Sequence, residues 1–301
     1  MIEAVLVVLA YAGLTLWWLW PLPTAPAAAA LIAHDPFVGF TDYYLVLWIL
    51  AWGAHALSRS PLHLFDANVF HPAPASLAFS EHLLGHQPLF APVYWISGNA
   101  VLAANVLLFA MQVACAATTY ALVRRFASAP AAFLAGTLFA SCPWRYETTQ
   151  QFHLLGTQYL PLVVLFAERL LERGRRRDAC FLAVAASLQV LSSVYFAFAT
   201  VLLLAGYLPL ALVRWRARLD LRRATRLAMA LAVPAILLGA TSLPYMRLRA
   251  AGLIPVYWQG NALGVEYAPA MVWRLLTTSA VGALGYLLGA VALLPPWRGR
   301  G

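Results

Sequence analysis

Residues 178–213 decide the fold of this chain, and they read DACFLAVAASLQVLSSVYFAFATVLLLAGYLPLALV. One arginine-rich run precedes this apolar stretch at 173–177, and another follows it at 214–226. A single helix of this length would be about 54 Å long, whereas the hydrocarbon core of a bilayer is about 30 Å thick. We therefore predict that the stretch crosses a membrane twice, as a hairpin that turns at Ser192 and Ser193.

The composition of the whole chain agrees with a membrane location. Of its 301 residues, 63% are hydrophobic and only 10% are charged, with a mean hydropathy of +0.75. A soluble domain does not have this composition, whereas a helical protein that crosses the bilayer several times does. All the basic residues are arginines in short runs between apolar segments. The net charge of +9 therefore indicates cytoplasmic loops and not nucleic-acid binding.

The apolar segments predict an all-α, polytopic protein with about eight spans in a single membrane domain, residues 1–301. Their approximate bounds are 4–20, 99–123, 126–143, 154–171, 179–192, 194–213, 227–243 and 275–294. With both termini in the cytoplasm, fifteen arginines lie inside and five outside, as expected from the excess of positive charge on cytoplasmic loops. Abundant alanine without lysine favours a bacterial source, so we expect the bacterial inner membrane.

The longest segment between spans is 21–98, which this topology places in the periplasm ahead of the further spans in 99–294. The first span is expected to be retained, because no positive charge precedes it and prolines follow it where a signal peptide has small residues. Two juxtamembrane helices are expected in the loop. One covers Tyr43 to Leu57 along the membrane surface, with Trp48 and Trp52 at headgroup level. The other runs from a capping Ser80 towards Ile96, broken at Pro88 and Pro92.

Two carboxylates, Asp35 and Asp42, follow the first span closely. An acidic residue beside the bilayer is costly unless it is solvated, paired or used, so both are candidates for chemistry. Asp42 is the candidate catalytic base; it also suits the capping position of a helix that begins at Tyr43, and both roles can hold at once. Asp35 precedes Pro36 and either takes part in catalysis or metal binding, or caps a turn.

Several motifs resemble a group of bacterial multipass proteins in the GT-C superfamily of membrane glycosyltransferases. The matching residues are Asp42 with Trp48 to Trp52, Pro61 to Asn68, Ser80-Glu81-His82, and His153-Leu-Leu with Gln158 and Pro161. The resemblance covers roughly residues 30–215. It implies transfer of a sugar from a polyprenyl-phosphate donor to a lipid, glycan or protein acceptor on the periplasmic side. It also implies an active-site role for Glu81, and substrate contacts for His153 and Gln158.

An inverting sugar transfer needs one carboxylate to take the proton from the acceptor hydroxyl, and we assign this role to Asp42. His82 and His86 are four residues apart, a spacing at which one helical face can share a divalent metal ion. Their alternative role is ordinary interfacial polarity, so no cofactor is assigned firmly.

Three arginines on the predicted outer side, Arg145, Arg247 and Arg249, are candidate phosphate ligands, since arginine contacts phosphate through two donors at once. The alternative is that they extend towards lipid headgroups.

Two other classes of protein remain open. One is a non-catalytic protein, either a pseudo-enzyme or a partner subunit whose missing C-terminal part another chain supplies. The other is a transporter, which is disfavoured because no paired halves with interrupted helices are visible and the polar residues gather in the outer loop. No Walker, dinucleotide-binding or serine-nucleophile motif is present, and nothing indicates a nucleic-acid partner.

Overall fold

The computed structural model describes residues 2–31, 36–142, 145 and 148–253, with side chains from Asp42 onward in the second of these ranges. The chain divides into two compact units, 1–247 and 248–301, and the second is described only as far as Leu253. The expected span at 275–294 lies outside the described residues. So does Asp35.

The described residues form helices and no strands, which confirms the all-α class. The α-helices are α1 (Ile2–Trp18), α2 (Pro36–Arg59), α3 (Gln87–Ser97), α4 (Ala100–Val123), α5 (Ala129–Ala140), α7 (Phe152–Leu155), α8 (Leu160–Arg173), α9 (Arg176–Val190), α10 (Val194–Arg214) and α11 (Leu221–Ala250). Short 3₁₀ turns are η1 (Leu22–Thr24), η2 (Pro61–His63), η3 (Ser76–Phe79), η4 (Leu84–His86) and η5 (Arg216–Arg218).

Four helical segments among the described residues are long and apolar enough to cross a membrane: α4, the pair α7–α8, α10 and α11. Two shorter helices, α1 and α5, are also apolar. Each of the first seven predicted spans overlaps one of these helices or α9. The chain is thus a helical membrane protein.

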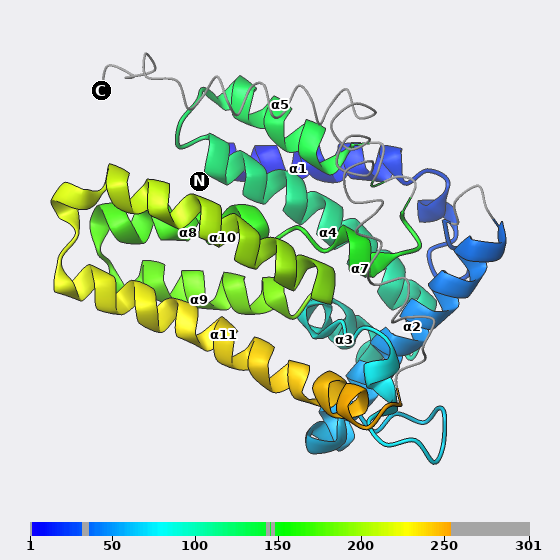
Figure 1. Cartoon of the computed structure of the whole chain (residues 1–301). Coiled ribbons are helices and arrows are strands. Elements are labelled where there is room, and N and C mark those ends of the chain that lie inside the picture. Colours follow the sequence, from blue (N-terminus) through cyan, green and yellow to red (C-terminus); the bar gives the residue numbers. More distant parts are fainter. Residues whose placement is uncertain (1, 32–35, 143–144, 146–147, 254–301) are drawn as a thin grey trace, which may run out of the picture. The chain divides into compact units, whose positions relative to one another are not determined.

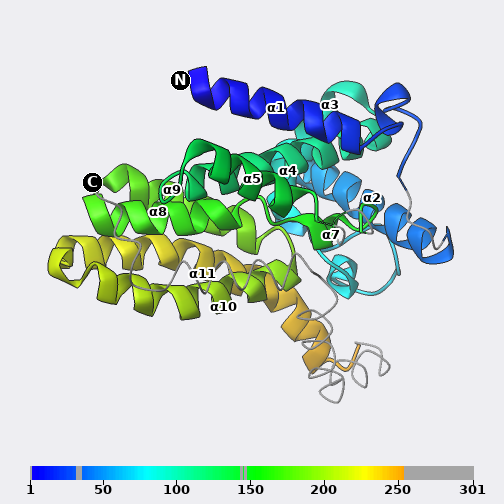
Figure 2. The ribbon, with the colours of Figure 1, turned by 90° about the horizontal axis from the view of Figure 1, so that it is seen from above.

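Helix α4 packs against α1, α3, α5 and α8, and so lies at the centre of the first unit (Figures 1 and 2). The hairpin predicted at 178–213 is confirmed, because α9 ends at Val190 and α10 begins at Val194. Ser193 caps α10: its Oγ accepts a hydrogen bond from the Tyr195 N–H at 3.1 Å. The α9–α10 turn lies at the opposite end of these helices from the α8–α9 and α10–α11 turns (Figure 1).

The first helix of the outer loop differs from its prediction. Helix α2 begins at Pro36 and not at Tyr43, because proline suits the first turn of a helix, where its missing N–H is not needed. Asp42 therefore lies inside α2 and is not its cap. The indole N–H groups of Trp48 and Trp52 donate to Asn68 Oδ1 at 3.2 Å and to the Leu64 carbonyl at 2.8 Å. The loop that follows α2 thus satisfies the polar edge of both tryptophans.

The prediction of a helix from Ser80 towards Ile96 is wrong for its first half. Ser80 to Leu83 are not helical, and α3 begins only at Gln87, with Pro88 in its first turn and Pro92 inside it without a break. The residues before α3 pack on the α9–α10 turn, where the Gly85 N–H donates to the Leu191 carbonyl at 2.7 Å. A Cβ at Gly85 would lie 2.1 Å from the Leu188 carbonyl oxygen, so only glycine allows this approach.

Candidate functional site

The segment from Phe152 to Arg173 is interrupted between α7 and α8, at Gly156 to Tyr159. Gln189 of α9 bridges the break: its Nε2 donates to the Gly156 carbonyl at 2.6 Å, and its Oε1 accepts from the Tyr159 N–H at 3.2 Å. Irregular backbone at membrane depth is tolerated where protein groups satisfy it. This segment is therefore an interrupted helix, which the sequence analysis did not predict.

Arg145 also stabilises the irregular chain between α7 and α8. It is not exposed, as a phosphate ligand would be. Its side chain is 4% exposed. Its three nitrogens donate to Gln112 Oε1 at 2.8 Å, Thr157 Oγ1 at 2.8 Å and the Leu155 carbonyl at 3.0 Å. The structure thus gives Arg145 a role in holding the chain between α7 and α8.

The break places α7 beside Asp42. Gln151, the residue before α7, donates a hydrogen bond from its Nε2 to Asp42 Oδ2. His153 is the second residue of α7. It lies close enough to Asp42 for the charge of the carboxylate to act on its ring. The His153 ring faces Tyr195 of α10, with centroids 6.0 Å apart and planes inclined by 32°.

Glu81, in the loop before α3, contacts the N-terminal end of α10. Its Oε2 accepts a hydrogen bond from the Val194 N–H at 2.8 Å, so a carboxylate lies at the positive end of the α10 dipole. Burial raises the pKa of Glu81 to about 7, although the hydrogen bond from Val194 opposes this shift. Tyr195, the residue after Val194, is 58% exposed. We call Asp42, Glu81, Gln151, His153 and Tyr195 the carboxylate–tyrosine cluster.

The two histidines proposed to hold a metal do not share a helical face, because the chain is irregular before η4. Burial lowers the pKa of His82 to about 4 and that of His86 to about 3, so both are neutral near pH 7. His86 packs against the α7–α8 break: a Cβ at Gly156 would lie 2.8 Å from its Cε1. Within the described ranges, no three His, Cys, Asp or Glu side chains are placed to hold a metal ion.

Three further site residues were predicted, Gln158, Arg247 and Arg249. Gln158 is fully buried, and its amide has no hydrogen-bond partner in the described part of the chain. Arg247 is exposed on α11. Arg249 is exposed in the second compact unit, so it is not related here to the cluster.

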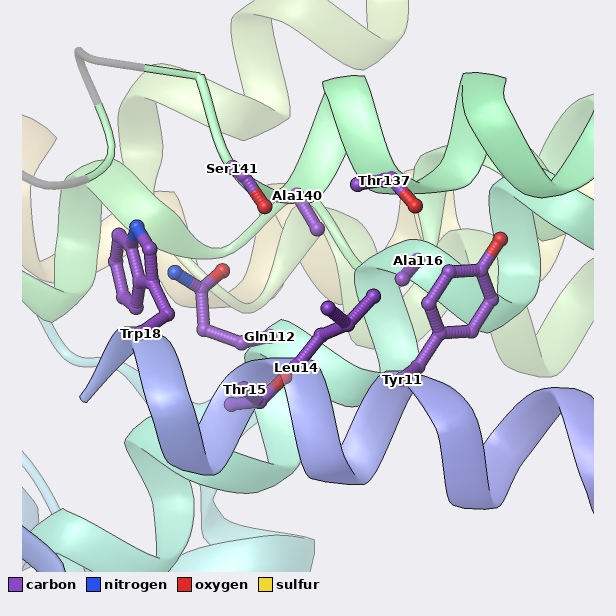
Figure 3. Close-up of a pocket in the computed structure, with 9 residues that line it drawn as sticks. All are labelled: Tyr11, Leu14, Thr15, Trp18, Gln112, Ala116, Thr137, Ala140 and Ser141. Atoms are coloured by element: carbon purple, nitrogen blue, oxygen red, sulfur yellow. The ribbon is translucent and has the colours of Figure 1, made fainter. Parts of the chain in front are cut away.

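A separate cavity lies between α1, α4 and α5 (Figure 3). Its volume is about 20 Å³, which suits one water molecule and no larger ligand. The Gln112 amide lies near Trp18 and Ser141 at this cavity (Figure 3), and its Nε2 has no hydrogen-bond partner among the described residues. The cavity therefore does not accommodate a substrate.

Sequence reasoning missed Gln151, Gln189 and Tyr195. The pair Gln150-Gln151 is a polar signal beside an apolar run, and it was available in the sequence. Tyr195 directly follows the predicted turn, where an aromatic residue is ordinary at a membrane interface. Comparisons of the chain with protein-family models, with curated proteins and with solved structures gave no match.

Proposed function

We propose that the protein is a GT-C-type glycosyltransferase of the bacterial inner membrane. It would transfer a sugar from a polyprenyl-phosphate donor to a lipid, glycan or protein acceptor on the periplasmic side. The observation that carries this proposal is the hydrogen bond from Gln151 to Asp42, because it orients a carboxylate beside the polar groups of α7 and α10. The motif resemblance supplies the class of reaction.

The proposed topology has eight spans with both termini in the cytoplasm. The arginine-rich turns after α4, α8 and α10 support it, since positive charge favours cytoplasmic loops. The ends of α4 and α8 are joined by an ion pair of 2.7 Å between Arg125 and Glu172. The carboxylate–tyrosine cluster lies at the α9–α10 turn, at the other end of these helices, which this orientation assigns to the periplasm (Figure 1).

In the proposed reaction, the acceptor hydroxyl gives its proton to Asp42 while its oxygen bonds to the anomeric carbon. The bond from that carbon to the donor phosphate breaks, and the phosphate leaves with the electron pair. Gln151 donates a hydrogen bond to Oδ2 of Asp42, and in this proposal Oδ1 takes the proton. A positioned general base of this kind typically accelerates a reaction by about 10²–10⁴-fold.

The test is Asp42→Asn, with sugar transfer measured in membranes that contain the native carrier lipid. We expect a loss of about 10²–10⁴-fold in turnover at unchanged protein abundance. The matched control is Asp66→Asn, since Asp66 is an exposed carboxylate of the same outer segment that pairs with His63 at 3.1 Å. Transfer by Asp42→Asn at the wild-type rate would eliminate Asp42 as base. Transfer that appears only when a second chain is added would favour the partner-subunit alternative.

A transporter is the second candidate, because the break between α7 and α8 resembles the discontinuous helices that form transporter sites. However, the side chains of Gln189 and Arg145 already form hydrogen bonds with backbone groups at this break. These groups are therefore not free to bind a substrate. Proteoliposomes that move a labelled lipid-linked sugar between leaflets without transferring it would favour this candidate over the enzyme.

A further inference from the structure

We propose that the C-terminal ends of α4, α8 and α10 form a binding site for the headgroup of an anionic phospholipid. The site consists of four arginines and two aromatic rings, which we call the arginine cluster: Arg125, Arg173, Arg214 and Arg218 with Phe126 and Trp215. Basic side chains from three separate turns meet here at the ends of candidate membrane spans. The inference goes beyond the proposed function and does not depend on sugar transfer.

Glu172, near the end of α8, joins the three turns. Its Oε2 pairs with Nη2 of Arg125, after α4, at 2.7 Å and with Nε of Arg173 at 3.3 Å. The Glu172 carbonyl accepts a hydrogen bond from Nη1 of Arg218, in the turn after α10, at 3.4 Å. Arginines from distant parts of the sequence are therefore held around a single point.

Two aromatic rings fix the guanidinium groups. Arg125 and Arg214 lie over the Phe126 ring, with their Cζ atoms 5.8 and 5.5 Å from its centroid. Arg214 and Arg218 lie over the Trp215 ring in the same way, at 5.4 and 5.3 Å. A guanidinium stacked on a ring keeps the N–H donors at its edge, and it loses less freedom when these donors bind an anion.

The carboxylates near the cluster already have partners within the protein. Glu172 is shared by two arginines. Glu168 is 2% exposed and accepts hydrogen bonds of 2.6 and 3.0 Å from two neutral side chains. Asp220 pairs with Arg223 at 3.0 Å. None of these groups is thus left to neutralise a further arginine.

Arg214 and Arg218 are the arginines that remain for an external anion. Both side chains are exposed, and neither forms an ion pair within the part of the chain that the structure describes. Both guanidinium groups lie against the Trp215 ring, so one headgroup can contact the two. Arginine contacts phosphate through two parallel donors, which suits the phosphodiester of a phospholipid.

The setting favours a lipid over a soluble phosphate. The cluster lies at the ends of α4, of α10 and of the segment Phe152–Arg173, all of which are candidate membrane spans. Apolar side chains beside the arginines are exposed: Phe126 by 54% and Val213 by 66%. Acyl chains would cover these side chains, whereas a soluble anion would leave them in water. Basic residues at the membrane surface also attract anionic lipids.

The competing explanation is that these arginines only orient the chain in the membrane. That role depends on the number of positive charges near the spans and not on their arrangement. Arg175 and Arg176 meet it equally well: both are exposed at the start of α9, without an ion pair or ring contact among the described residues. The two pairs of arginines therefore distinguish a built site from simple charge.

The experiment uses the full chain purified in detergent, with lipid binding measured by native mass spectrometry. The probes are phosphatidylglycerol and phosphatidylcholine with identical acyl chains. We expect phosphatidylglycerol to bind at least about 10-fold more tightly, because two unpaired arginines attract its net negative charge. Excess glycerol phosphate should not displace the lipid. Equal binding of the two lipids would overturn the proposal, and so would complete displacement by glycerol phosphate, which would indicate a site for soluble phosphate.

The double variant Arg214→Gln, Arg218→Gln should lose most of the preference for phosphatidylglycerol. The double variant Arg175→Gln, Arg176→Gln is the matched control, since it removes the same charge nearby and should keep the preference. Equal losses in the two variants would leave only the effect of net charge and refute the site.

A second variant tests the arrangement without changing any charge. Phe126→Leu removes the ring under Arg214 and should reduce the preference about 3-fold, since an exposed contact of this kind is weak. Phe126 is exposed, so its replacement should leave the Tm in detergent close to that of the wild type. An unchanged preference in this variant would show that the ring does not position the arginine for binding.

Discussion

The side-chain amide of Gln151 donates a hydrogen bond to the carboxylate of Asp42, which lies 109 residues earlier in the chain. Helix α2 provides the carboxylate, and the residue before α7 provides the amide. Neither element orients the pair alone, so the relationship depends on the break that turns α7 towards α2. Four predictions concern this arrangement and its surroundings.

Gln151→Met keeps the length of the side chain and removes the donor to Asp42. We expect kcat for sugar transfer to fall about 10-fold or more with little change in KM, because the base loses its orientation and the substrate contacts remain. Gln150→Met is the control, since Gln150 is buried next to it but its Oε1 has no hydrogen-bond partner among the described residues. Equal losses in both variants would mean that Gln151 is merely structural.

Gln189→Leu should destabilise the fold, because it leaves the Gly156 carbonyl and the Tyr159 N–H without their partner. Each buried polar group left unsatisfied costs about 1–3 kcal/mol, so we expect a clear fall in Tm in detergent. Ser187→Ala on the same helix is the control, since the Ser187 hydroxyl has no described partner and its removal should be nearly neutral. A wild-type Tm for Gln189→Leu would contradict the bridging role.

The pH dependence of stability should change in Glu81→Gln. The folded protein raises the pKa of Glu81 from 4.5 to about 7, so it binds this proton more tightly than the unfolded chain does. Glu81 therefore lowers stability progressively as pH rises from about 4.5 to 7, by at most about 3 kcal/mol. His82 and His86 act in the opposite direction, because their lowered pKa values reduce stability as pH falls below 6.5.

The measurement is consequently a difference between Glu81→Gln and wild type, taken as Tm against pH from 5 to 8. The variant should gain stability relative to wild type towards pH 8, since its amide oxygen can still accept from the Val194 N–H. A constant difference across the range would show that the Glu81 carboxylate does not titrate there.

The topology makes a prediction that is independent of catalysis. A reporter fused after Arg177 or Arg226 should be cytoplasmic, and one inserted in the 66–80 loop should be periplasmic. Arg177 lies in the first turn of α9 and Arg226 near the start of α11, whereas the carboxylate–tyrosine cluster lies at the α9–α10 turn. A reversed reporter in correctly expressed protein would place that cluster on the wrong side for the proposed carrier lipid.

Sequence patterns predicted the helices well where one apolar run makes one helix. The α9–α10 turn at Ser192 and Ser193 followed from length alone, because a longer helix would not fit the bilayer. The break between α7 and α8 was not predictable in this way. Its polar residues are few in an apolar run, and Gln189, which satisfies the backbone there, belongs to another helix.

The candidate site was predictable only in part. The carboxylates of Asp42 and Glu81 stood out because acidic residues are rare in this chain. Their surroundings depended on tertiary packing, which also unwound the expected helix at Ser80 to Leu83 against the α9–α10 turn. Arg145 was assigned to the outer surface from its position between spans, yet its hydrogen bonds hold it inside.

The hydrogen bond between Glu81 and Val194 has a consequence for synthesis of the protein, because its partners are separated by 113 residues. At about 5–20 residues per second, the ribosome adds Val194 roughly 6–23 s after Glu81. During that interval the loop around Gly85 has no α9–α10 turn to pack on. The segment around Gly85 can therefore pack on this turn only after the α9–α10 hairpin has been made, and the site is completed late in synthesis.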